Sequence, residues 1–389
     1  MKLLIVGHSY AIAGAQDKFV TMKQLDSSLQ IRLLTWRKSN YLSMDWEREI
    51  HPALTNEEVV SIRDMFSKSH MTYILDPVLL TRLFRRFRPD HIHIEEDPHS
   101  FVGVETVLLA RLFCREATIS FFIWDNLWRQ PFFPLNMLKK AFTKFSLSRC
   151  SLVICGNTEA GQLLSKKGYH GRRQNLPQVG FNQEEYVTAA RSELRQQFIA
   201  GQEGVLIGFL GRLVPEKGVI LLLKALVGLR HLPWKLLICG AGPLEKEIRE
   251  DWQSFYGPRL ILRRSIPRTE VAEYLKCLDI FVLPSYEINS WKEQFGMTLA
   301  QAMMAGVACI GSSSGSIPEV LGPGGLIFNE GNVESFVAAL ERLLSSKSER
   351  ETYGRKGRQF ATQHYTSRKV SAAYLEAFSN LLDNKGGYA

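Results

Sequence analysis

Short apolar runs alternate with amphipathic stretches along this chain, and the alternation starts afresh at residue 205. This pattern predicts parallel β-sheets that are covered by helices on both faces. The 389 residues are too many for one ordinary core, so two domains are expected. We place the first domain at residues 1–182 and the second at residues 203–365. The predicted fold class is therefore α/β, with two Rossmann-like doubly wound domains whose ligand crevices lie at the carboxyl ends of the strands.

The expected elements follow from where the hydrophobic period changes. In the first domain we predict strands at 2–7, 31–36, 91–95, 119–124 and 152–156, with helices at 15–25, 77–87, 103–113, 135–148 and 158–167. In the second we predict strands at 205–210, 234–239, 260–263, 279–283, 307–310 and 325–328, with helices at 218–229, 243–255, 268–278, 295–305 and 333–345. The polar stretch 181–204 is the expected connection, and the tail from about residue 366 has a helical pattern.

Composition excludes several classes of protein. No run of about 18 apolar residues occurs, which argues against a transmembrane helix. The six cysteines form no C-x-x-C pair and sit mostly in apolar runs, as is typical of core residues in a reducing cytosol. The net charge of +9 is concentrated in the first half, which favours an anionic partner such as a lipid surface or an anionic sugar. No nucleic-acid-binding motif accompanies it.

Residues 211–218 read GRLVPEKG and follow the predicted strand 205–210. Two cations, Arg212 and Lys217, stand beside glycines that let the backbone approach a phosphate. A surface turn with solvated charges is the alternative for this octamer. Its place between a strand and a helix favours a phosphate site.

Residues 291–301 read WKEQFGMTLAQ, and a helix is expected to begin at Gly296. The free N–H groups of a helix N-terminus suit a phosphate, and Glu293 precedes them as an acid that can accept sugar hydroxyls. Alone, Glu293 could equally be a capping acid. Together, the two segments offer what a nucleoside diphosphate-sugar needs: cations for the diphosphate and a carboxylate for the sugar.

This pair of segments resembles the signature of the retaining GT-B glycosyltransferases of family 4, the glycosyl transferases group 1, which carry G-R-L-x-x-x-K-G and E-x7-E. The spelling W-x-E-Q-F-G is similar to that of a subgroup from bacterial surface-glycan pathways. The chain departs from the family at Gln301, where the second glutamate normally takes the ribose hydroxyls. A neutral amide can still bond a diol, so we expect weaker nucleotide binding or a changed base preference.

The resemblance implies a GT-B fold, with two Rossmann-like domains that face a central cleft and a last helix that crosses back onto the first domain. Arg212 and Lys217 would stabilise the leaving diphosphate while Glu293 orients the sugar, and fixed cations would make a metal unnecessary. The implied donor-binding positions also include Gly211, Gly240, Ser265, Ile266, Phe295, Gly296, Met297 and Gln301.

In the first half the candidates are weaker. Gly14 either approaches the diphosphate or simply starts a helix. The alternation of His91, His93 and Glu95 allows a metal triad, but a strand that directs Glu95 toward an acceptor is favoured. Further residues expected in the cleft or on the acceptor side are His8, His99, Asp125 and Asn126.

The predicted function is transfer of a sugar, with retained configuration, from a UDP- or GDP-sugar to a glycan or a lipid-linked acceptor. No cofactor is expected. The alternatives are a GT-B nucleotide-sugar epimerase and a non-catalytic GT-B partner subunit, whereas a Rossmann dehydrogenase lacks its G-x-G-x-x-G after the first strand. Residues 131–149 mix aromatic and basic side chains, which fits either an anionic membrane surface or an ordinary helix. The expected location is the cytoplasm, with the inner face of the membrane as the site of any such docking.

Overall fold

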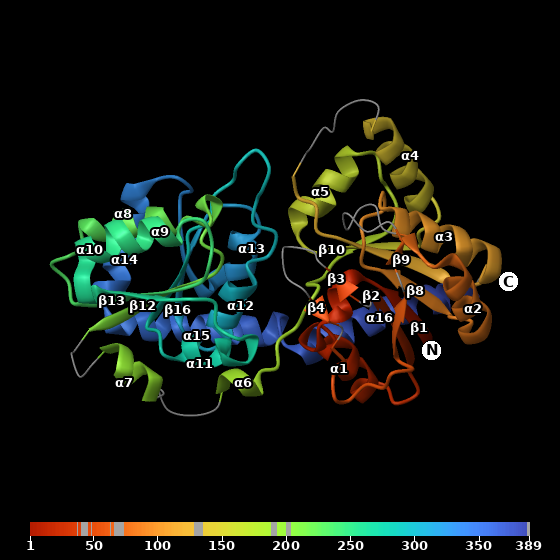
Figure 1. Cartoon of the computed structure of the whole chain (residues 1–389), viewed down its shortest axis with the longest axis horizontal. Helices are drawn as coiled ribbons and strands as arrows, with labels where there is room; N and C mark the ends of the chain where they lie inside the picture. The colour runs from red at the N-terminus through yellow and green to blue at the C-terminus, as the bar shows by residue number, and fades with distance from the viewer. Residues whose placement is uncertain are drawn as a thin grey trace. The chain divides into compact units, whose positions relative to one another are not determined.

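The computed structural model describes residues 1–36, 38–39, 46–47, 49–62, 64–65, 74–127, 135–187, 193–199 and 204–386 (Figure 1). The chain divides into two compact units, Met1–Gly180 with Ser367–Ala389 and Phe181–Thr366. Each unit is built on one parallel sheet with helices packed on it, which confirms the predicted fold class.

The sheet of the first unit has the strand order β11-β10-β9-β8-β1-β2-β5, and all its pairs are parallel. Its strands are β1 (Lys2–Val6), β2 (Gln30–Trp36), β5 (Val59–Ile62), β8 (His91–Ile94), β9 (Thr118–Ile123), β10 (Leu152–Cys155) and β11 (Arg173–Asn175). Two antiparallel pairs lie outside this sheet, β3 (Lys38–Ser39) with β4 (Trp46–Glu47) and β6 (Asp64–Met65) with β7 (Ile74–Leu75). The sequence did not predict β5, β11 or these short pairs, because none of them carries a long apolar run.

Helices cover both faces of this sheet. Side chains alternate along β1, so that Leu3 and Ile5 enter one buried cluster and Leu4 and Val6 enter another. The first unit has the helices α1 (Asp17–Leu25), α2 (Pro77–Phe87), α3 (Phe101–Phe113), α4 (Leu135–Leu147), α5 (Thr158–Lys166) and α16 (Ser367–Gly386). The last of these, α16, packs on α1, where the Ser371 hydroxyl donates to the Lys18 carbonyl over 2.8 Å.

The sheet of the second unit has the order β14-β13-β12-β15-β16-β17, again with parallel pairs. Its strands are β12 (Val205–Leu210), β13 (Trp234–Cys239), β14 (Leu260–Arg263), β15 (Ile280–Leu283), β16 (Ala308–Ser312) and β17 (Gly325–Phe328). All six were predicted to within two residues, because strands buried on both faces read as continuous apolar runs.

The helices of the second unit are α6 (Glu184–Val187), α7 (Glu193–Ile199), α8 (Val219–Val227), α9 (Glu245–Glu247), α10 (Gln253–Tyr256), α11 (Val271–Lys276), α12 (Met297–Met304), α13 (Ile317–Leu321), α14 (Val333–Ser345) and α15 (Lys347–His364). The predicted helix 243–255 is helical from Glu245 to Tyr256, with a π-helical stretch at Ile248–Trp252 between α9 and α10. No helix in the described part of the chain is long and apolar enough to cross a membrane.

A buried ion pair joins α1 to the end of β8. The Lys18 ammonium lies 2.7 Å from Glu95 Oε1, and both side chains are almost fully buried. Glu95 also contacts His93 Nε2 at 3.1 Å and accepts from Gln178 Nε2 at 2.6 Å. Burial alone would raise the pKa of the Glu95 carboxyl, but Lys18 and His93 outweigh burial and hold that pKa well below its usual value.

Glycine permits a close backbone approach between β12 and β13. A Cβ atom on Gly240, which follows β13, would lie 1.9 Å from the Gly211 carbonyl oxygen, which follows β12. A Cβ atom on Gly218 would lie 1.9 Å from the Pro284 carbonyl oxygen, and Gly218 has a φ of 72°. Three loops at the carboxyl edge of the second sheet are therefore in direct backbone contact, and only glycine fits at these two positions.

We predict that Glu95→Gln lowers the free energy of unfolding by about 3–5 kcal/mol, because it leaves the Lys18 charge buried without its partner. The matched control is Glu351→Gln, whose partner Lys347 is 3.9 Å away at the surface, and its expected loss is about 1 kcal/mol or less. Urea denaturation measures both variants. The double variant Lys18→Met/Glu95→Gln should recover much of the loss. Equal losses in Glu95→Gln and Glu351→Gln would contradict the prediction.

The same pair predicts a pH dependence. Because the folded pKa of Glu95 lies below its ordinary value of 4.5, its stabilisation is present above pH 4.5 and is lost as the pH falls through the folded pKa. Part of the acid-induced decrease in unfolding free energy should therefore disappear in the double variant.

We predict that Gly240→Ala destabilises the protein by about 1–3 kcal/mol, since the added methyl group must displace the backbone at Gly211. Gly228→Ala is the control, because a Cβ atom there meets nothing within 4 Å and the backbone is already helical. That change should be neutral or slightly stabilising. Melting temperatures compare the two, and an unchanged value for Gly240→Ala would refute the close approach.

Candidate functional site

The strand order of the second sheet reverses between β12 and β15, which are neighbours. In parallel sheets of this topology, ligands bind at the carboxyl edge beside such a reversal, where the loops after the two strands lie side by side. The segment 211–218 follows β12 directly, and the segment 284–296 follows β15. Topology therefore brings together the two motifs that sequence singled out, although more than 70 residues separate them.

An ion pair connects the two motifs. The Lys217 ammonium lies 2.6 Å from Glu293 Oε2, with side-chain exposures of 16% and 8%. The Ser285 hydroxyl donates to the same oxygen over 3.0 Å. The ring centroid of Trp291 lies 4.7 Å from the Lys217 ammonium, close enough for a cation–π contact. A cation, a carboxylate, a hydroxyl and an aromatic ring thus meet at one point of the sheet edge.

The loop that follows β16 forms hydrogen bonds with the backbone of Glu293. The Ser316 backbone N–H and hydroxyl both donate to the Glu293 carbonyl, at 3.2 and 3.1 Å. Gly315 has a φ of 53°, and a Cβ atom there would lie 2.2 Å from that carbonyl oxygen. Ser285 and Ser316 were not predicted as supports of Glu293, because a single serine in a loop gives no recognisable signal.

The helix α12 begins at Met297, immediately after Gly296. Gly296 has a φ of 75°, so a glycine there allows the chain to enter the helix without strain. Met297 is 56% exposed, whereas the Phe295 ring is buried and packs edge-on against Tyr365. Phe295 can therefore offer a ligand its backbone but little of its side chain.

Gln301 lies one helical turn beyond Met297 and makes a contact that the sequence did not suggest. Its Nε2 donates to the Tyr186 hydroxyl over 3.0 Å. Tyr186 belongs to α6, in the polar connection, and is buried. Burial raises the pKa of Tyr186 to about 12, so its hydroxyl keeps its proton at neutral pH. The tyrosine therefore fixes the orientation of the Gln301 amide.

The remaining candidates of the second unit follow strands at the same edge. Gly211 and the exposed Arg212 follow β12, and Gly240 follows β13 in contact with Gly211. Ser265 and Ile266 follow β14, the third strand in that direction, and are exposed and half-buried respectively. The structure thus gathers the second-unit candidates along one sheet edge.

The first unit has its own reversal of strand order, between β1 and β8. His8 follows β1, and its Nδ1 and backbone N–H both lie 2.7 Å from Glu96 Oε1, beyond the end of β8. Burial alone would lower the pKa of His8, but Glu96 outweighs it and raises that pKa above 6.5. Gly14 lies in a 3₁₀ turn, Ala13–Ala15, that leads toward α1.

Glu95 is buried, so the prediction that it points toward an acceptor is wrong. Its side chain has no exposed surface and is bonded to Lys18, His93 and Gln178. His91 and His93 share its sheet face as predicted, but His91 bonds Thr118 and Ser120. No group of three potential metal ligands occurs among the residues that the structure describes. Glu95 therefore belongs to the core of the first unit.

The last three candidates lie beyond β8 and β9. His99 is half-buried with an unbonded Nε2, and burial lowers its pKa, an effect that Lys139 and Lys167 strengthen. Asp125 pairs with Lys167 at 2.9 Å, and Asn126 donates to Glu159 over 3.2 Å. These contacts show how the side chains are held, and the acceptor contact of each stays a prediction. Of the basic aromatic stretch 131–149, residues 131–134 lie outside the described residues.

Known proteins resemble this chain in sequence. Residues 190–360 match the family described as Glycosyl transferases group 1. A sulfoquinovosyl transferase of Arabidopsis thaliana is 24% identical over 317 residues, which cover 79% of this chain and 59% of that protein. A GDP-mannose-dependent phosphatidylinositol monomannoside mannosyltransferase of Mycolicibacterium smegmatis is 28% identical over 197 residues, covering 49% of this chain and 51% of that protein. The chain thus spans little more than half the length of these relatives.

Solved structures share the fold. The Anabaena protein HepE in complex with UDP superposes with a TM-score of 0.74 at 16% identity, covering 98% of this chain and all of that one. A glycosyltransferase from Rickettsia africae gives a TM-score of 0.76 at 14% identity, covering 98% of this chain and 99% of that one. The fold is that of the GT-B glycosyltransferases, and residues 190–360 are similar in sequence to the glycosyl transferases group 1.

Proposed function

We propose that this protein is a glycosyltransferase that moves a sugar from a nucleoside diphosphate-sugar to a glycan or lipid-linked acceptor. The observation that carries the proposal is the contact between Lys217 and Glu293 at the strand reversal of the second unit, with the exposed Arg212 on the same loop as Lys217. The presence of UDP in the HepE structure supports a nucleotide-sugar as the donor class.

Sugar transfer requires positive groups near the leaving diphosphate and a carboxylate near the donor sugar. The bond between the anomeric carbon and the diphosphate oxygen breaks, and negative charge develops on the leaving diphosphate. Arg212, Lys217 and the first N–H groups of α12 would stabilise that charge. We propose that these fixed positive groups serve where other transferases use a metal ion.

Glu293 is proposed to accept hydrogen bonds from the hydroxyls of the donor sugar. Its carboxylate is held by Lys217 and Ser285, and its carbonyl by Ser316, so it is positioned before any sugar arrives. In this proposal the acceptor hydroxyl attacks the anomeric carbon on the face that the diphosphate leaves and passes its proton to the departing diphosphate. Configuration is then retained, as the resemblance to family 4 suggests. The W-x-E-Q-F-G spelling supports a place among surface-glycan enzymes.

We predict that Lys217→Ala and Arg212→Ala each lower kcat/KM by about 100-fold or more, because each removes a cation from the leaving group. The matched controls are Lys224→Ala and Arg355→Ala, which remove exposed cations of the second unit outside this site. Circular dichroism checks the fold, and donor turnover is measured with UDP-, GDP- and ADP-sugars. Near-normal turnover in either site variant would refute the phosphate assignment.

Calorimetric titration with UDP, GDP and ADP identifies the base and separates the alternatives. Selective binding of one nucleotide that Lys217→Ala abolishes supports a donor site. Sugar turnover that needs no acceptor would indicate an epimerase instead, and binding of none of the nucleotides would indicate a non-catalytic subunit.

We predict that Gln301→Glu tightens binding of the preferred nucleoside diphosphate by about fivefold, since a carboxylate bonds a ribose diol more strongly than an amide does. The change should be tolerated, because the protonated Tyr186 hydroxyl can donate to a carboxylate in place of accepting from the amide.

The control for this variant is the 2′,3′-dideoxy nucleotide, which lacks both ribose hydroxyls. Calorimetry should show no gain with that ligand. A gain of equal size with both nucleotides, or no gain with either, would count against the ribose contact of Gln301.

A further inference from the structure

The helix α3 is apolar on both of its faces. Its inner face packs into the core through Val102, Val107 and Ala110. Its outer face carries Leu108 and Leu112, which are 48% and 54% exposed. A helix at the surface of a soluble domain normally presents polar side chains outward, so an outer face of this kind indicates a further partner.

The helices α2 and α4, which contact α3, also carry exposed apolar side chains. On α2, Val78 and Leu79 are 56% and 40% exposed, and on α4, Met137 and Leu138 are 60% and 45% exposed. Phe101 of α3 meets Phe142 of α4 with ring centroids 5.9 Å apart, so apolar contact continues from α3 to α4. We call the exposed sides of these three helices the α2–α4 surface.

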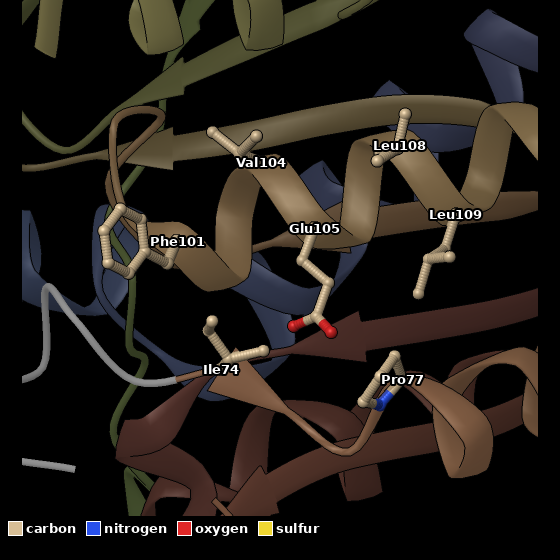
Figure 2. A pocket seen from close by; sticks show the side chains of 7 residues that line it. All are labelled: Ile74, Pro77, Phe101, Val104, Glu105, Leu108 and Leu109. Carbon is tan, nitrogen blue, oxygen red and sulfur yellow. The ribbon is translucent and has the colours of Figure 1, made fainter. Parts of the chain in front are cut away.

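A hollow opens in this surface where α3 faces β7 and the start of α2 (Figure 2). Its volume is about 370 Å³, within the range of small-molecule pockets. Apolar side chains line it except for Glu105, whose carboxyl group lies between Ile74 and Pro77 in Figure 2 and accepts from the Leu75 N–H over 3.0 Å. A hollow with an almost wholly apolar lining suits a flexible apolar ligand such as a lipid tail.

The charges of the α2–α4 surface are almost all positive. The three helices contain seven basic residues and one acidic residue, Glu105. Burial raises the pKa of Glu105 to about 7 and the nearby Asp76 adds to this effect, although the Leu75 N–H opposes it. Near neutral pH the one carboxyl within the three helices is therefore only partly ionised, and their basic residues outnumber it and the capping Asp76. Exposed cations include Arg82, Arg86, Lys140 and Lys144.

We propose that the α2–α4 surface docks on an anionic lipid bilayer, with lipid tails against the apolar side chains and lipid phosphates against the basic ones. The combination selects this occupant, because apolar burial and attraction to anionic lipid are the two contributions that hold a helix in the plane of a membrane. The surface lies within the first unit and uses none of the residues assigned to the donor. It therefore stands apart from the proposed sugar transfer.

The test is co-sedimentation of the full chain with vesicles of phosphatidylcholine, with and without phosphatidylglycerol. The wild-type protein should bind the anionic vesicles at least about tenfold more tightly than the neutral ones. Leu108→Ser/Leu112→Ser should weaken that binding about tenfold or more. The matched control is Val227→Ser/Ile327→Ser, which changes two exposed apolar residues of the second unit and should bind as wild type.

A second pair of variants tests the charge. Arg86→Gln/Lys140→Gln should weaken binding about tenfold or more at low salt, whereas Lys246→Gln/Lys347→Gln, at highly exposed positions of the second unit, should not. Calorimetry with the preferred nucleotide and circular dichroism confirm that the variants fold.

Three results would overturn the proposal. One is failure of the wild-type protein to bind anionic vesicles, and another is wild-type binding by the Leu108/Leu112 variant. The third is a dimer in lipid-free sedimentation velocity that this variant abolishes, since a second copy would then be the occupant of the surface.

Discussion

The ion pair between Lys217 and Glu293 depends on the order in which six parallel strands are paired. Because the order reverses between β12 and β15, the loops after these two neighbouring strands meet at one edge of the sheet. The meeting requires glycine at Gly218, where any side chain would strike the Pro284 carbonyl. Backbone packing therefore fixes the positions of the two charged side chains. Both remain partly exposed at the edge of the sheet.

The first unit places charges at the equivalent topological position but treats them differently. Lys18 and Glu95 are withdrawn into the core, whereas His8 and Glu96 pair beside them with His8 partly exposed. A buried pair of this kind is costly to desolvate and is retained only when its bonds are complete, as those from His93 and Gln178 help to make them here. The pair joins α1 to the end of β8, directly beside Glu96, which pairs with His8.

Sequence predicted the sheets well and the polar contacts poorly, for physical reasons. Strands such as β12 are buried on both faces and are therefore visible in the sequence as apolar runs. In contrast, β11 is exposed along its whole length and has no apolar run. The sequence predicted that the segments with Lys217 and Glu293 come together, because each residue sits in a recognisable motif, but it did not predict the ion pair between them. The contact of Lys18 with Glu95 spans 77 positions and that of Tyr186 with Gln301 spans 115, and no local pattern pairs either residue with its partner.

The tyrosine contact explains how a glutamine can occupy position 301. An amide with no fixed neighbour could rotate and present either its oxygen or its nitrogen to a ligand. Because Nε2 donates to the buried Tyr186 hydroxyl, the amide oxygen is left as the acceptor for a donor such as a ribose hydroxyl. What the glutamine lacks in charge is offset in part by preorganisation, since less rotational freedom is lost on binding. Gln301 and the connection that carries Tyr186 are therefore coupled structurally through this hydrogen bond.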